Sequence, residues 1–109
     1  MRRIILALAA TLPMATTALA QTAAQAELVA QGRRVAETWC ANCHLIGPEA
    51  RGPAGDAAPP FAAIARMPST TEMALRVFLQ TPHARMPDYR LSTAELDGVV
   101  AYILSLKGR

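Results

Sequence analysis

The sequence is short of the features that mark large enzymes, nucleic-acid-binding proteins and disordered segments. A length of 109 residues allows one domain at most, which excludes two-domain enzymes and barrels. Charged residues make up only 17%, and no run of like charges exceeds two, so a disordered tail is not expected. Lysine occurs once, and the formal net charge is +3. A clustered basic surface for nucleic acid is therefore absent from the pattern.

Strand patterns and hydrolytic sites are missing as well. No run of residues alternates valine, isoleucine or threonine with polar residues, as a half-buried strand would. Outside one cysteine motif, no nucleophile stands in a pattern with a general base. The sequence therefore predicts an all-α protein that is not an enzyme.

The N-terminus has the pattern of an export signal. Arg2 and Arg3 precede the apolar run of residues 4–12, and Ala18-Leu19-Ala20 offers small residues where a signal peptidase cleaves. The prediction is a signal peptide over residues 1–20, cut before Gln21, and a domain over residues 21–109 in the periplasm. An uncleaved anchor is the alternative. A spanning helix needs about 20 apolar residues, and Pro13 interrupts this stretch.

The two cysteines form the most informative motif. Removing the first 20 of the 109 residues leaves 89, and a domain of that size usually needs a disulfide, metal or cofactor for stability. Cys40-Ala41-Asn42-Cys43-His44 reads C-x-x-C-H, the attachment motif of a c-type haem. Two thiols at this spacing can bond both vinyl groups of one porphyrin. The following imidazole can then ligate its iron.

Three other roles of the cysteines compete with haem attachment. A disulfide between Cys40 and Cys43 would close a very small loop, of the kind that is usually redox-active. A thioredoxin-like motif requires a βαβ context, which the pattern lacks. A zinc site needs four ligands, and the chain offers only these cysteines with His44 and His83, at a spacing unlike that of zinc fingers.

Hydrophobic periodicity and capping signals predict helices over residues 24–39, 61–66, 70–80 and 92–107. Two capping boxes are predicted, at residues 69–72 and 92–95. Met73, Val77 and Phe78 are expected to face inward in the third helix, and Leu75 is a further candidate for this face. The last helix is expected to bury Leu96, Val99, Val100, Ile103 and Leu106. Residues 45–60 and 82–91, which are rich in proline or glycine, are predicted loops.

The second axial ligand of the iron decides between electron transfer and ligand binding. The candidates after residue 20 are Met67, Met73, Met86 and His83. Met86 is favoured because it lies in a predicted loop far beyond His44. Pro87 also pushes it into an extended conformation, from which a side chain can project. Met73 has the periodicity of core packing, and Met67 and His83 remain alternatives.

Together these residues resemble the class I c-type cytochromes, over essentially all of the chain after residue 20. The resemblance implies an all-α fold with three to five helices around one covalent haem c and its iron. It implies that Gly32 in the first helix crosses the last helix near Val99 and Tyr102, and that the carbonyl of Pro59 accepts a hydrogen bond from the proximal imidazole. Two features depart from the family: Ala36 stands where an aromatic is common, and arginines replace the usual ring of lysines.

The predicted function is that of a periplasmic electron carrier with His44 and Met86 as axial iron ligands and unidentified redox proteins as partners. No nucleic acid and no transmembrane segment are expected. Two alternatives are a dedicated haem subunit of a periplasmic oxidoreductase complex and a ligand-binding sensor with a labile sixth ligand. Trp39 is expected beside the haem or in the core. The expected apolar neighbours of the haem are Leu45, Phe61, Ile64, Met67, Val77, Phe78 and Ile103.

Overall fold

The computed structural model describes residues 13–48, 58–82 and 85–108, and these form helices joined by irregular segments. Four α-helices follow one another along the chain: α1 (Pro13–Trp39), α2 (Phe61–Arg66), α3 (Glu72–Gln80) and α4 (Thr93–Ser105). A short 3₁₀-helix, η1 (Leu106–Gly108), continues α4. The described residues contain no β-strand, so the all-α prediction is confirmed.

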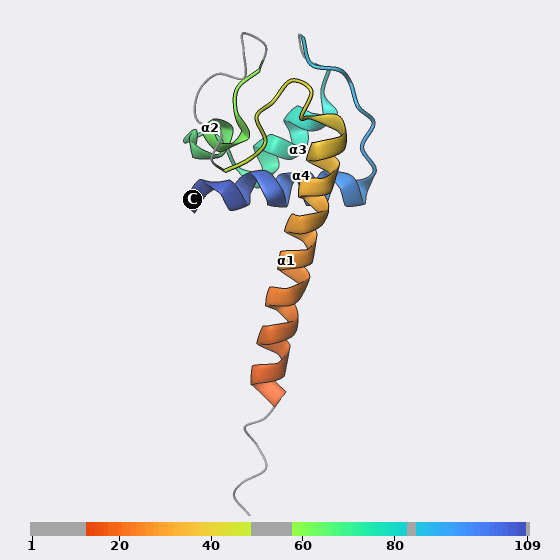
Figure 1. The fold of residues 1–109 in the computed structure, drawn as a ribbon. Coiled ribbons are helices and arrows are strands. Elements are labelled where there is room, and N and C mark those ends of the chain that lie inside the picture. The colour runs from red at the N-terminus through yellow and green to blue at the C-terminus, as the bar shows by residue number, and fades with distance from the viewer. Residues whose placement is uncertain (1–12, 49–57, 83–84, 109) are drawn as a thin grey trace, which may run out of the picture.

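Helix α1 is longer than predicted. Its C-terminal end at Trp39 matches the prediction, but it covers residues from Pro13 rather than from residue 24. The added residues include the alanines and glutamines of residues 18–25, which favour helix without needing a packed face. In Figure 1 this part of α1 projects away from the other helices, and the side chains of residues 17–27 are exposed. No helix in the described part of the chain is long and apolar enough to cross a membrane.

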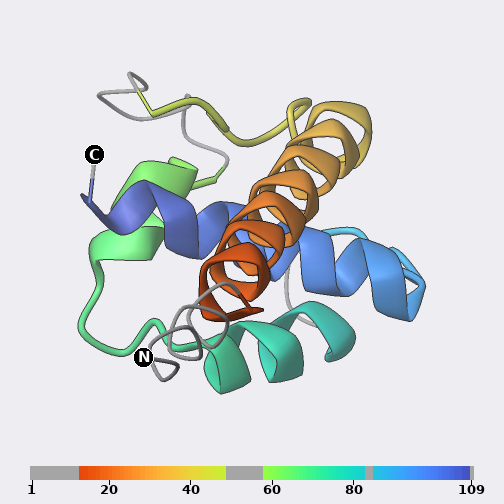
Figure 2. The ribbon, with the colours of Figure 1, turned by 90° about the horizontal axis from the view of Figure 1, so that it is seen from below.

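The crossing of α1 over α4 is the centre of the fold, as Figure 2 shows along the axis of α1. Glycines occupy both sides of the crossing. A Cβ added to Gly32 would lie 1.8 Å from the carbonyl oxygen of Gly98 and 2.9 Å from Cβ of Tyr102. The predicted crossing of Gly32 near Tyr102 is therefore confirmed, and the glycine inside α4 is explained by close backbone contact.

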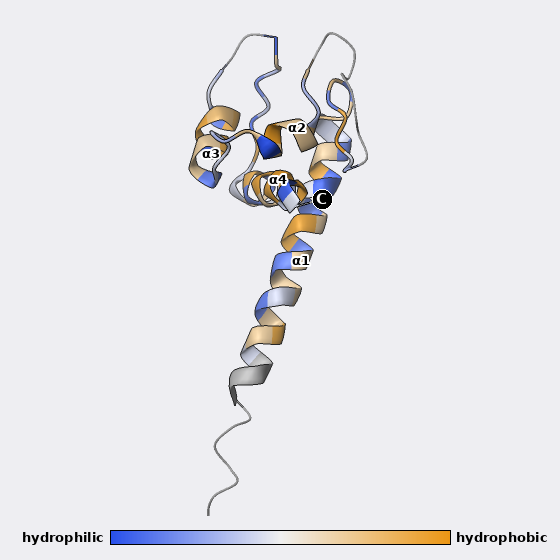
Figure 3. Ribbon diagram, turned by 90° about the vertical axis from the view of Figure 1, so that its left-hand side faces the viewer, coloured by the Kyte–Doolittle hydropathy of each residue, from blue (hydrophilic) through white to orange (hydrophobic). Residues whose placement is uncertain are grey.

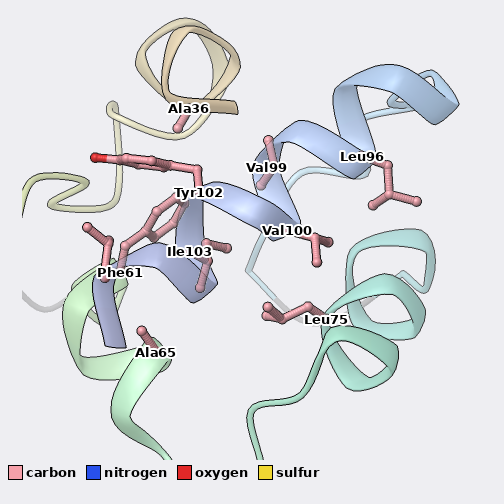
Figure 4. Packing of buried hydrophobic residues seen from close by; sticks show 10 residues of the cluster. Ala36, Phe61, Ala65, Leu75, Leu96, Val99, Val100, Tyr102 and Ile103 are labelled. Carbon is pink, nitrogen blue, oxygen red and sulfur yellow. The ribbon is translucent and has the colours of Figure 1, made fainter. Parts of the chain in front are cut away.

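The buried core lies along α4, six of whose residues are buried. Figure 3 looks nearly along the axis of α4 and shows the hydrophobic residues of this helix in orange. All five residues predicted to be buried in the last helix are buried. In Figure 4, Val100 of α4 faces Leu75 of α3, and the ring of Tyr102 lies between Ala36 of α1 and Phe61 of α2. The centroids of the Phe61 and Tyr102 rings are 6.4 Å apart.

The two capping predictions had different outcomes. Ser92 and Glu95 form the predicted capping box of α4. The box predicted at residues 69–72 is wrong, because the N-cap of α3 is Thr71. Thr71 is in extended conformation, and its hydroxyl accepts a hydrogen bond from the amide of Ala74. Helix α3 therefore starts two residues later than predicted, and Glu72 is free to pair with Arg76 at 3.0 Å.

The buried face of α3 also differs from the prediction. Leu75 is the buried residue of α3, whereas Met73, Val77 and Phe78 are 70%, 57% and 53% exposed. The prediction that these three side chains belong to the core is wrong for Met73 and Val77. Phe78 has another role, because it lines the large cavity described next.

Candidate haem site

One cavity of about 500 Å³ contains all four predicted site residues in its lining: Cys40, Cys43, His44 and Met86. It lies between the end of α1, the C-terminal half of α2, the inner face of α3 and the segment before α4. Its walls are largely apolar, with Ile64, Met67, Leu75 and Phe78 among them. Pockets of this size and character hold organic cofactors.

The cysteine motif continues directly from α1. The amide of Cys40 donates to the carbonyl of Ala36 at 2.9 Å, and the amide of His44 donates to the carbonyl of Cys40 at 2.9 Å. These bonds fold residues 40–44 into a compact turn, so that Cys40, Cys43 and His44 all line the same cavity. The end of α1 therefore positions the whole motif.

Both cysteines are free thiols, so the disulfide considered from the sequence is not formed in this structure. Cys43 is exposed and Cys40 is partly buried, and this burial raises the pKa of the Cys40 thiol. A protonated thiol is a poor metal ligand, because metals bind the thiolate. Within the described residues, no group of three or more histidines, cysteines or carboxylates gathers as a metal site would require. His83, the fourth ligand of the zinc alternative, lies outside those residues.

The imidazole of His44 is held in a defined orientation. Its Nδ1 lies 2.7 Å from the carbonyl oxygen of Pro59. A carbonyl can only accept a hydrogen bond, so Nδ1 carries the proton and Nε2 keeps the lone pair that a metal requires. The ring also contacts Phe61, with centroids 5.1 Å apart. The Pro59 contact implied by the resemblance is therefore present.

The loop before α2 is tied to the core by further hydrogen bonds. The amide of Phe61 donates to the carbonyl of Leu45 at 2.9 Å, and the hydroxyl of Tyr102 donates to the carbonyl of Ile46 at 2.8 Å. Residues directly after His44 are thus fixed to both α2 and α4. The orientation of His44 rests on this buried support.

Met86 and Met67 both line the cavity, whereas Met73 does not. Met86 is partly buried and follows Arg85, whose φ of 70° places it in the left-handed region. Met67 is 45% exposed and ends α2. His83 lies outside the described residues. Two methionines therefore remain as candidates for a sixth ligand by their position alone.

The predicted apolar neighbours of the haem divide into three groups. Ile64, Met67 and Phe78 line the cavity, as expected. Phe61 and Ile103 are in the core instead. Leu45 and Val77 are exposed outside the lining, so the prediction is wrong for these two. Trp39 is 43% exposed and lines the cavity, which excludes its alternative role in the core.

Ser69, Thr70 and Tyr89 were not foreseen as parts of the site, and all three border the cavity together with Arg85. Thr70 is buried, and its hydroxyl donates to the carbonyl of Ile64 at 2.6 Å, which closes the turn between α2 and α3. Arg85 is the one residue with a permanent charge in the described lining. It is one of the arginines expected from the sequence to take the place of the lysine ring around the haem edge.

Comparisons with known proteins agree with this site. The family model described as cytochrome c oxidase, cbb3-type, subunit III matches residues 27–103. The chain belongs to this family of c-type cytochromes. It is also 38% identical to cytochrome c-552 of Bradyrhizobium diazoefficiens over 76 residues, which cover 70% of this chain and 72% of that protein. No solved structure matches it.

Membership of the family establishes the cofactor and the general activity. The cofactor of this cytochrome is covalently bound haem c with its iron, and its activity is haem-based electron transfer. The four-helix architecture is that of the cytochrome c fold. The residues present fit this group, since the cavity combines an apolar wall, two free thiols and an imidazole oriented through Nδ1.

Proposed function

We propose that this cytochrome is an exported, periplasmic electron carrier whose haem is bonded to Cys40 and Cys43 and ligated by His44 and Met86. The observation that carries the proposal is that these four side chains line one cavity although Met86 is 42 residues from His44 in the chain. The haem supplies a one-electron Fe(II)/Fe(III) couple.

The protein's own residues tune that couple. The Pro59 carbonyl accepts the Nδ1 proton of His44 and so leaves Nε2 available as the ligand that would hold the iron. A Met86 thioether is a soft ligand, which favours Fe(II) and raises the reduction potential. Ile64, Leu75 and Phe78 keep water from the cavity and disfavour the extra charge of Fe(III).

Arg85 supplies the charge that the cofactor's carboxylates require. A haem carries two propionates, and buried or partly buried carboxylates are stabilised by charge-assisted hydrogen bonds. Arg85 lines the cavity, and the hydroxyls of Ser69 and Thr70 border it too. The Thr70 hydroxyl already donates its proton to the Ile64 carbonyl, so we assign the propionate end of the site to Arg85 and Ser69.

Residues 1–20 act as the export signal in this proposal, and the mature chain starts at Gln21. The described part of α1 is consistent with cleavage there, because the side chains of residues 17–27 are exposed. Removing residues 17–20 of this helix takes away no residue of the buried core.

A role as the haem subunit of an oxidase is the second candidate. It is favoured by the family description, which names subunit III of a cbb3-type oxidase. The carrier is favoured by the resemblance to a cytochrome c-552 over most of both chains. Purification from native membranes distinguishes them: a carrier is recovered alone, and a subunit is recovered with the oxidase.

Two measurements on the purified protein test the proposed function. The denatured polypeptide should have the mass of residues 21–109 plus one haem, and the haem should stay bound in acidified organic solvent. The reduced native protein should not bind carbon monoxide. Extractable haem would exclude attachment to Cys40 and Cys43, and rapid carbon monoxide binding would support the sensor alternative.

A further inference from the structure

The segment that holds Met86 has little regular structure. We call residues 85–91 the distal loop. Two of its backbone hydrogen bonds are local, from the amide of Tyr89 to Pro87 and from the amide of Leu91 to Tyr89, each 3.0 Å long. Arg85 has a φ of 70°, a conformation that residues with a Cβ seldom adopt. Contacts outside the loop must therefore help to hold it in place.

Leu91 and Tyr89 attach the distal loop to the rest of the molecule. Leu91 packs against the buried core at the end that leads into α4. Nearer to Met86, the ring of Tyr89 packs against the indole of Trp39, with centroids 5.3 Å apart and planes inclined by 42°. This distance and tilt are within the favourable range for an aromatic pair.

Trp39 is the fixed member of this pair. It is the last residue of α1, and the next residue, Cys40, continues the helical hydrogen bonding to Ala36. Both Trp39 and Tyr89 line the cavity, together with Met86. A smaller hollow of about 20 Å³ between α1, α3 and the distal loop is also lined by Trp39, Met86 and Tyr89. The pair thus joins the attachment side of the site to the Met86 side.

We propose that Trp39 and Tyr89 form a latch that holds the distal loop, and with it the Met86 thioether, at the iron. This inference rests on the proposed function, because it assigns positioning residues to the Met86 ligation. The latch opposes displacement of Met86 by an external ligand, which must lift the distal loop away. It makes the sixth position effectively closed and so favours electron transfer over ligand binding.

The test is a titration of the oxidised holoprotein with imidazole, which competes with Met86 for iron. Loss of the near-red sulfur-to-iron absorption band reports the exchange. Tyr89→Leu keeps apolar bulk but removes the ring, and Tyr89→Phe is the matched control that keeps the ring. An aromatic pair of ordinary strength predicts that Tyr89→Leu binds imidazole roughly two- to twelvefold more tightly than wild type. Tyr89→Phe should match wild type.

A double-mutant cycle shows whether the two rings act together. Trp39→Leu alone should produce a gain in imidazole affinity similar to that of Tyr89→Leu, and the double variant should gain little more. Equal affinity in Tyr89→Leu and wild type, or fully additive effects in the double variant, would overturn the latch. The Tyr89 variants decide the matter alone if Trp39→Leu does not take up haem.

Failure of the latch and failure of Met86 ligation give different results. If wild type lacks the near-red band, Met86 is not the ligand and the proposed function fails in that respect. Amide hydrogen exchange of residues 88–91 then tests the ring contact by itself. Faster exchange in Tyr89→Leu, with unchanged exchange in α4, would show that the rings hold the loop, and unchanged exchange would overturn this as well.

Discussion

Gly32 of α1 and Gly98 of α4 meet backbone to backbone, and this contact sets how closely the two longest helices approach. A Cβ on Gly32 would lie 1.8 Å from the Gly98 carbonyl oxygen, a distance that no side-chain movement could relieve. A Cβ on Gly98 would lie 2.9 Å and 3.0 Å from the nitrogen and Cα of Gly32. The crossing in turn places Ala36, Trp39 and the cysteine motif above α4.

The asymmetry of this contact predicts an order of stability among alanine variants. Gly32→Ala should lower the free energy of unfolding by about 1 to 3 kcal/mol or more, because α1 and α4 must move apart. Gly98→Ala should be less damaging, since alanine adds about 1 kcal/mol of helix propensity. Gly108→Ala, with no atom within 4 Å of its added Cβ, is the control. Denaturant titration of the three holoproteins measures the order, and equal stability of Gly32→Ala and Gly108→Ala would contradict it.

The hydrogen bond from Tyr102 to Ile46 supports the segment that follows His44. Tyr102→Phe removes a hydroxyl that lies 2.8 Å from the Ile46 carbonyl and keeps the ring contact with Phe61. We expect a loss of about 1 kcal/mol in the free energy of unfolding, measured by denaturant titration. The haem spectrum should be retained, because the bond from His44 to Pro59 does not involve this hydroxyl. An unchanged stability would show that water replaces the bond without loss.

Glu95 connects the stability of α4 to pH. Hydrogen bonds from the amide and hydroxyl of Ser92 lower the pKa of Glu95 below its usual value. The folded-state pKa is thus below the unfolded value of about 4.3, so this stabilisation is complete above that pH and is lost as the pH falls through the folded pKa. Glu95→Gln should therefore be less stable than wild type at neutral pH. The difference in Tm should shrink on acidification, and a difference independent of pH would contradict this account.

Arg85 is predicted to influence the reduction potential. Removing a positive charge from the cavity stabilises Fe(III), so Arg85→Gln should have a lower midpoint potential than wild type. A tenfold change in the redox equilibrium would appear as a fall of about 59 mV. Arg90→Gln is the matched control, because Arg90 is exposed on the same loop and is not among the cavity-lining residues. Equal potentials for the two variants in a redox titration would contradict the assignment of Arg85 to the propionates.

Local sequence signals predicted the elements whose structure depends on neighbouring residues. The bounds of α2, the end of α1 and the capping box of Ser92 with Glu95 follow from short-range patterns, and the structure confirms them. The spacing of Cys40, Cys43 and His44 likewise fixes their placement on a single turn.

The errors arose where tertiary contacts decide the outcome. In α3, threonines or serine occupy three successive positions that can cap a helix, and only the fold selects Thr71. The apolar residues Met73 and Val77 lie on the outer face, because α3 packs on the rest of the protein through Leu75. The contact between Trp39 and Tyr89 joins residues 50 positions apart, and no local pattern indicates it.

The most direct test of the central claim is the near-red absorption of the oxidised holoprotein, compared between wild type and Met86→Ala. Met67→Leu is the control, because Met67 lines the same cavity. The account predicts the sulfur-to-iron band in wild type and Met67→Leu and its loss in Met86→Ala, with the haem still covalently attached. A band that persists in Met86→Ala, or disappears in Met67→Leu, would contradict the assignment of Met86 as the distal ligand.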